Sequence, residues 1–261
     1  MSSAEIPKPS VENDPSQGGE IKRMEFFASL QGKEFPPKEE RRVVHTYFFT
    51  VGAHAYQKRD TGEPFFEHPR ETALTLLNLP GIKNSNMISA ALLHDTPEDT
   101  SAFGGLEEGM THADWVNAAY DEIKHYFGRE VAIMVLTLTK PKVDGIEIID
   151  KKQAAEIYNR QLTEGIPFGL SMNIISKFRK PRWVTNLRSR TLLIKLADRF
   201  HNFRTIYTLD PDRIKRKIRE TEEELIPICE RVNSDYPQET EYLIAEIRKS
   251  IEIVRQARSI E

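Results

Sequence analysis

Hydrophobic residues in this chain recur mostly at three- and four-residue steps, the spacing of one face of an α-helix. Val43, Tyr47 and Val51 show this spacing within 39–57. Proline or glycine separates most of the periodic segments, and little of the chain alternates like a strand. The pattern therefore predicts an all-α fold. Helices are expected over residues 21–30, 39–57, 69–79, 85–95, 112–126, 130–138, 148–162, 187–209 and 237–253, with another beginning at Pro211.

Length and composition suggest how these helices are organised. A chain of 261 residues suits one large domain or two small ones. Residues 1–20 offer almost nothing to bury, so we expect a disordered tail there. We expect the main domain over residues 21–209, with the charged helices of 210–261 packed on its side.

Charge and cysteine content exclude several classes of protein. Hydrophobic residues make up 39% and charged residues 30%, and the net charge is -3, so the whole molecule is not an electrostatic nucleic-acid binder. No apolar run approaches the roughly 18 residues of a membrane span. The single Cys229 excludes an intramolecular disulfide and fits a reducing compartment. We expect a cytoplasmic protein with neither a specific nucleic-acid partner nor a membrane partner.

The strongest chemical signal follows an apolar run at 90–93. It leads directly into His94 and Asp95, and Glu98 and Asp99 come within one further turn. An imidazole and a carboxylate on one rigid element are typical ligands of a divalent metal, and nearby carboxylates suit acid/base chemistry. This stretch is therefore a candidate metal site.

A structural interpretation of the same stretch remains open. Thr96 can be an N-cap, Pro97 the first helical residue, and Asp99 the partner in a capping-box-like pattern. This explains the acidic residues but not His94 and Asp95 directly before them. The spacing alone favours neither interpretation.

Three earlier histidines are better explained by structure when each is taken alone. His45 and His54 lie on the predicted helix 39–57, and packing or surface roles are favoured for both. His68 directly precedes Pro69, which suits the first position of the next helix. A capping or packing role is therefore favoured for His68 as well.

A second polar cluster lies on the predicted helix 187–209. Asp198, Asn202 and Thr205 share one face, opposite an apolar one. This stripe either faces solvent or belongs to a buried central helix, and the apolar run 191–197 favours burial. A buried carboxylate there would need a cation partner.

Two basic segments carry weaker signals. The cluster 177–182 could bind nucleic acid or attract phosphates above a site, but a solvated loop is favoured. The run 213–219 is followed by acidic residues, so we interpret it as a solvated helix face without a site.

Three separated segments, 62–69, 91–100 and 195–205, resemble the HD phosphohydrolase superfamily, specifically the hydrolase domain of RelA/SpoT-type alarmone enzymes. They occur in the family's order, and the resemblance covers about 40–209. It implies an HD-domain helical bundle with a central metal site. Nothing resembles the family's synthetase or regulatory domains, so we expect a small stand-alone hydrolase.

The resemblance also implies roles for particular residues. Manganese, or another divalent first-row metal, would be bound by His68, His94, Asp95 and Asp198. Glu98 and Asp99 match the family's catalytic acidic pair. Substrate contacts are implied for Lys58, Arg59, Asn202, Arg204 and Thr205.

The implied reaction releases pyrophosphate from the 3′ position of (p)ppGpp. Asp60, Phe65 and Pro97 depart from the family's pattern, as does a longer segment between residues 100 and 192, and we place these departures on the nucleotide side. An HD phosphohydrolase of another nucleotide, such as a mononucleotide or NADPH, is therefore an alternative, and a binding module without turnover is a less favoured one. The oligomeric state stays open, with a homodimer as one option.

Overall fold

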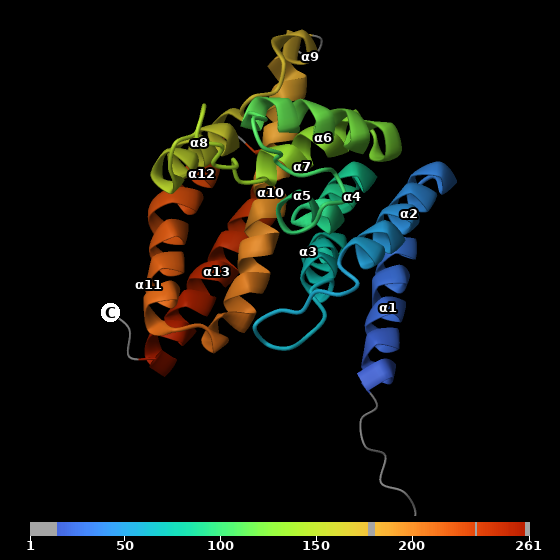
Figure 1. Cartoon of the computed structure of the whole chain (residues 1–261). Helices are drawn as coiled ribbons and strands as arrows, with labels where there is room; N and C mark the ends of the chain where they lie inside the picture. The colour runs from blue at the N-terminus through green and yellow to red at the C-terminus, as the bar shows by residue number, and fades with distance from the viewer. Residues whose placement is uncertain (1–14, 177–180, 233, 259–261) are drawn as a thin grey trace, which may run out of the picture.

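The computed structural model describes residues 15–176, 181–232 and 234–258, and every regular element in these ranges is helical (Figure 1). The all-α prediction is therefore confirmed for the described residues. Most of the expected tail 1–20 lies outside these ranges, as do residues 177–180 of the basic cluster.

The helices follow one another with short connections. Their bounds are α1 Pro15–Gln31, α2 Pro37–Ala53, α3 Glu67–Asn78, α4 Ser85–Leu93, α5 Thr96–Asp99, α6 His112–Phe127, α7 Arg129–Leu138, α8 Lys151–Glu164, α9 Met172–Ser176, α10 Pro181–Thr205, α11 Pro211–Arg219, α12 Ile226–Arg231 and α13 Pro237–Arg258. A short 3₁₀ turn, η1 Ile206–Thr208, follows α10, and a π-helical turn, η2 Glu220–Leu225, joins α11 to α12.

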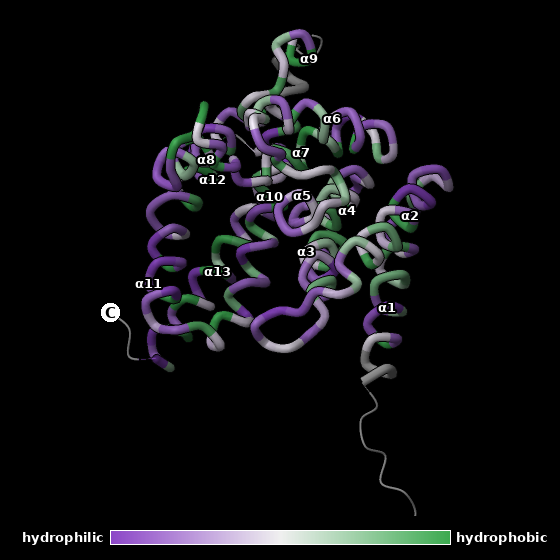
Figure 2. Tube along the Cα trace, in the orientation of Figure 1, coloured by the Kyte–Doolittle hydropathy of each residue, from purple (hydrophilic) through white to green (hydrophobic). Residues whose placement is uncertain are grey.

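Helix α10 runs through the middle of the molecule and packs against α3, α4, α7, α8 and α13. Leu193, Ile194, Leu196 and Ala197 on it are completely buried, which confirms the prediction of a central helix. Along the Cα trace, α11 at the edge of the molecule is mostly hydrophilic, and hydrophobic and hydrophilic residues alternate along the other helices (Figure 2). A carboxylate on the inner part of α10 is thus placed far from bulk water.

Helix α4 is the second element of the core and is buried along almost its whole length. Its N-cap is Asn84, whose side chain accepts a hydrogen bond from the Met87 amide at 2.9 Å. The next residue, Ser85, is the first residue of the helix and does not cap it. Ser85 instead donates to Glu39 on α2 at 2.7 Å, so its hydroxyl ties α4 to α2.

The short helix α9 was not predicted, and most of the other differences lie at helix ends. α3 begins at Glu67, so His68 and Pro69 both lie inside its first turn. Pro227 falls at the start of α12, directly after the π-helical turn. Since proline has no N–H, the helix cannot continue its regular hydrogen bonds there, and the wider turn accommodates the break. Beyond it, α13 packs along α10.

Within the described residues, no helix combines the length and the hydropathy that crossing a bilayer requires.

Candidate metal centre

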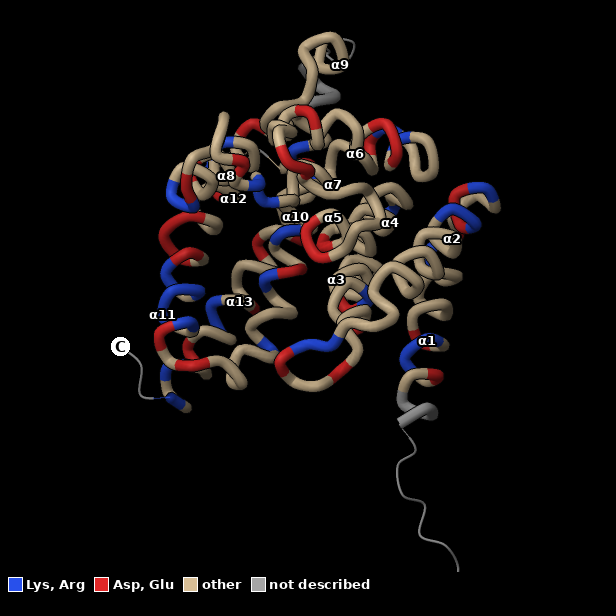
Figure 3. Tube along the Cα trace, in the orientation of Figure 1, with Lys and Arg blue, Asp and Glu red and all other residues tan. Residues whose placement is uncertain are grey.

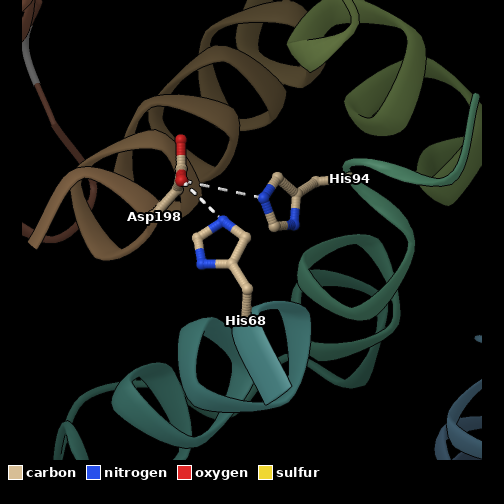
Figure 4. A group of neighbouring side chains, drawn as sticks. All are labelled: His68, His94 and Asp198. Carbon is tan, nitrogen blue, oxygen red and sulfur yellow. Dashed lines mark ion pairs between the residues drawn. The ribbon is translucent and has the colours of Figure 1, made fainter. Parts of the chain in front are cut away.

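Three elements far apart in sequence meet at one buried cluster of side chains (Figure 4). His68 comes from the first turn of α3, His94 from the residue after α4, and Asp198 from α10. These three helices pack against one another, which brings the side chains together. One ligand atom of each lies within 4.8 Å of the others, and all three residues are buried.

The distances place Asp95 at the same centre. His68 Nε2 is 3.0 Å from Asp198 Oδ1, and His94 Nε2 is 3.8 Å from the same oxygen. The two carboxylate oxygens of Asp95 lie 3.3 Å from His68 Nε2 and 3.3 Å from His94 Nε2. Two imidazole nitrogens and two carboxylates therefore surround one point, a donor set that suits a divalent first-row cation.

The orientation of His94 fits a metal ligand. Its Nδ1 donates to the Ala91 carbonyl at 2.7 Å, which leaves the lone pair on Nε2. That Nε2 is buried and has no hydrogen-bond partner among the described residues. A buried nitrogen without a partner is costly, and a cation at the centre would satisfy it.

The electrostatics of the His68, His94 and Asp198 cluster favour a bound proton or a bound cation. Burial alone would raise the pKa of Asp198, but Lys195 and the two imidazoles hold it well below its usual value. Burial would lower the pKa of His94, yet the carboxylates of Asp95 and Asp198 raise it to about 9. Without a metal, the centre therefore retains a proton that a divalent cation would displace.

Lys195 is the cation partner that the buried carboxylate on α10 required. Its Nζ lies 2.8 Å from Asp198 Oδ2, so the other oxygen, Oδ1, is the one turned toward the imidazoles. Nearby Asp198 outweighs burial and raises the pKa of Lys195. The sequence analysis did not single out Lys195, although its position three residues before Asp198 was the available signal.

His201 is a second residue that the sequence analysis missed. Its Nδ1 is 2.7 Å from His68 Nδ1 and 3.3 Å from an Arg59 guanidinium nitrogen. Burial, followed by the charges of His68 and Arg59, lowers the pKa of His201 to about 3. A neutral His201 therefore accepts from His68 Nδ1–H, which leaves the His68 Nε2 lone pair facing the centre.

His201→Phe is expected to weaken metal binding about 10- to 100-fold, because nothing then sets the tautomer of His68. Calorimetric titration with Mn²⁺ measures the affinity, and NMR of the imidazole nitrogens reports the tautomer of His68. His45→Phe is the matched control, since His45 is exposed and stacks on Phe127. Unchanged affinity in His201→Phe would contradict this role.

The acidic pair lies beside the cluster, on the single turn α5. Glu98 accepts from the Lys140 backbone amide at 2.7 Å, and the Lys140 ammonium lies 3.4 Å from its other oxygen. Burial, then the charges of Asp95 and Glu98, raises the pKa of Asp99 to about 6. A carboxyl group with such a pKa can exchange protons near neutral pH.

The capping-box interpretation of this turn is wrong. Asp95 occupies the N-cap position, without a side-chain cap, and Thr96 is already helical and buried. The Thr96 hydroxyl instead lies 3.4 Å from His54 Nε2. The Gln57 side-chain oxygen accepts from His54 Nδ1 at 2.6 Å, and the Gln57 amide nitrogen donates to the Asp99 backbone carbonyl. His54 is thus a buried packing residue that supports α5.

Four of the five predicted substrate residues line one cavity of about 220 Å³ beside the cluster: Lys58, Arg59, Asn202 and Thr205. Arg59 donates to the Asn202 side-chain oxygen at 3.1 Å, and Asn202 donates to Asp198 Oδ1 at 2.6 Å. Arg204 does not join them. It lines a different groove, where its guanidinium lies 5.9 Å from the Phe200 ring centre.

Comparison with known proteins agrees with this arrangement. The HD domain family matches residues 47–164. The chain is 31% identical over 197 residues to the bifunctional (p)ppGpp synthase/hydrolase SpoT of Escherichia coli (strain K12), which covers 76% of this chain and 22% of that protein. It is also 31% identical to a guanosine-3′,5′-bis(diphosphate) 3′-pyrophosphohydrolase of Aquifex aeolicus, over 75% of this chain and 22% of that one.

A further relative is the GTP pyrophosphokinase rsh of Brucella ovis, 30% identical over 80% of this chain and 23% of the relative. The chain thus spans less than a quarter of the length of these relatives. The helical fold, the buried His-Asp cluster and these matches together show that the chain contains an HD domain of the RelA/SpoT type.

Proposed function

We propose that this protein removes pyrophosphate from the 3′ position of (p)ppGpp in a metal-dependent hydrolysis. The observation that carries the proposal is the convergence of His68, His94, Asp95 and Asp198 on one buried point. The similarity of this chain to proteins named as guanosine-3′,5′-bis(diphosphate) 3′-pyrophosphohydrolases supports (p)ppGpp as the substrate.

We propose manganese as the cation held by His68, His94, Asp95 and Asp198. The unpartnered His94 nitrogen and the set of two imidazoles and two carboxylates suit manganese or another first-row divalent ion. When bound, such an ion lowers the pKa of water and polarises a phosphoryl oxygen.

The acidic pair, Glu98 and Asp99, acts on the attacking water and its proton. We assign Asp99, whose pKa is raised to about 6, to accept the proton of the attacking water. Glu98, anchored by Lys140, helps to orient that water. The water oxygen forms a bond to the α-phosphorus of the 3′-diphosphate, and the bond between that phosphorus and the 3′ oxygen breaks. Pyrophosphate leaves, and the 3′ oxygen gains a proton to give GDP or GTP.

The cavity beside the centre suits the nucleotide. Arg59 is held by Asn202 and His201, so its planar guanidinium is fixed where it can stack on the guanine base. Lys58 neutralises phosphate, and Asn202 and Thr205 contact the substrate. Since Arg204 faces another groove, we leave it outside this site. We place the HD unit at 21–209, with 210–261 packed against it.

A nucleotide panel tests the proposal. With Mn²⁺ present, we expect ppGpp to yield GDP and pyrophosphate, and pppGpp to yield GTP and pyrophosphate, with chelation abolishing both reactions. NADPH and mononucleotides belong in the same panel, with products identified by mass. Turnover of NADPH or a mononucleotide, with ppGpp left intact, would contradict (p)ppGpp as the substrate. It would support the alternative of an HD phosphohydrolase that acts on another nucleotide.

A further inference from the structure

The C-terminal helix α11 contributes basic side chains to the cavity beside the metal centre. Arg213 and Lys217 lie one helical turn apart on α11, and both line this cavity. Ile214 and Ile218, on the adjacent face, are buried in the core and hold the helix in place. The sequence analysis had interpreted this basic run as a solvated face without a site.

The cavity carries an excess of positive charge. Lys58 and Arg59 come from the loop before α3, Arg213 and Lys217 from α11, and Asp60 is the one acidic residue in the lining. Figure 3 shows the basic positions on both segments. Asp60 lies 3.5 Å from the Arg213 guanidinium, so its charge is already compensated. The other cations of the lining face no carboxylate within ion-pair distance among the described residues.

Lys217 is half-buried in this lining, whereas Lys58 is exposed. The ammonium group of Lys217 makes no ion pair or hydrogen bond with the described residues. Burial, followed by the charge of Arg199, lowers the pKa of Lys217 to about 8. A partly buried cation without a counter-ion is costly, and a bound anion would remove that cost.

The cavity is separate from the metal centre. None of the four metal-ligand candidates lines it, and Arg59 and Asn202 stand between the two sites through their bonds to His201 and Asp198. At about 220 Å³ it is smaller than the roughly 300–1,000 Å³ of pockets that enclose a whole ligand. It therefore suits part of a nucleotide whose 3′ end lies at the metal centre.

We propose that Arg213 and Lys217 form a phosphate-binding subsite for the 5′-phosphates of the nucleotide. This inference rests on the proposed function for the position of the 3′-phosphates. Asp60 holds Arg213 at the edge of the cavity, and Lys217 provides the uncompensated charge within it. Helix α11 lies outside the three sequence segments that resemble the family. Its basic side chains thus set how strongly the 5′-phosphates contribute to nucleotide binding.

Binding of GDP, GMP and guanosine to the whole protein, measured by calorimetry, tests the subsite without any turnover. For the unmodified protein we expect affinity to fall in the order GDP, GMP, guanosine. Lys217→Gln should lower GDP affinity about tenfold or more, because a charge-assisted contact to phosphate is lost, and should leave guanosine affinity unchanged. Lys217→Arg, which keeps the charge, should restore most of the GDP affinity.

The control is Lys215→Gln on the exposed face of the same helix, which should bind GDP normally. Equal loss of GDP and guanosine affinity in Lys217→Gln, or no loss for either, would overturn the subsite. Hydrolysis of ppGpp is assayed in parallel. If the protein binds GDP through Lys217 but releases no pyrophosphate from ppGpp, the proposed function fails and the subsite stands.

Discussion

Asp198→Asn is expected to lose metal binding and turnover together. The substitution removes the charge that faces His68 and His94, while the amide keeps the shape of the side chain and an oxygen that can accept from Lys195. A metal ion contributes several kcal/mol to a hydrolysis of this type, so the rate should fall roughly 1,000-fold or more.

Calorimetry with Mn²⁺ and a ppGpp hydrolysis assay measure these two losses separately. The folded state must be checked by circular dichroism, because the Lys195 side chain is only 11% exposed, and leaving it without a charged partner costs up to about 3–5 kcal/mol. Asp121→Asn is the control, since Asp121 is exposed and, within the described residues, forms its ion pair with Lys124 on the same helix. Retained Mn²⁺ affinity in folded Asp198→Asn would refute the proposed centre.

Glu98→Gln is expected to keep the metal and lose turnover. Glu98 is not among the side chains that meet at the centre, and its anchor is the Lys140 backbone amide. The amide of Gln can still accept that hydrogen bond, but it lacks the negative charge with which Glu98 orients the attacking water for proton transfer to Asp99. Positioned acid/base groups contribute about 10²- to 10⁴-fold, and the loss should fall in that range.

Mn²⁺ affinity and turnover are measured on the same preparation, with Glu108→Gln in the exposed loop before α6 as control. The pH profile adds a second test of the acidic pair. Asp99 accepts a proton only when ionised, so activity should fall as the pH drops through about 6, or through a lower value once a cation is bound. Full activity in Glu98→Gln would remove Glu98 from the mechanism.

Much of the centre was predictable because its residues stand in short local patterns. The apolar run before His94 and Asp95 predicted a buried helix end, and α4 is buried as expected. The apolar face of 187–209 predicted a central helix with an interior carboxylate, and Asp198 is 4% exposed. Assignment of His68 needed the resemblance, since on its own it was better explained as a packing residue.

Lys195 and His201 could not be assigned from the sequence in the same way. A lysine and a histidine on a helix are ordinary surface residues unless their surroundings are known. His201 meets the imidazole of His68, which comes from α3, and Lys195 lies 2.8 Å from Asp198 on a face of α10 that only the packed fold buries. Arg204, in contrast, lay in a matching segment yet faces another groove.

The sequence by itself determined the helical class, most helix positions and the segments that carry the chemistry, because hydrophobic period and turn residues act over a few neighbouring positions. Only the tertiary structure decided which side chains meet. It brought α3, α4 and α10 to one point and placed Lys217 of α11 at the cavity that Arg59 and Asn202 also line. Those contacts depend on how distant helix faces pack, and periodicity within one helix carries no information about its partner.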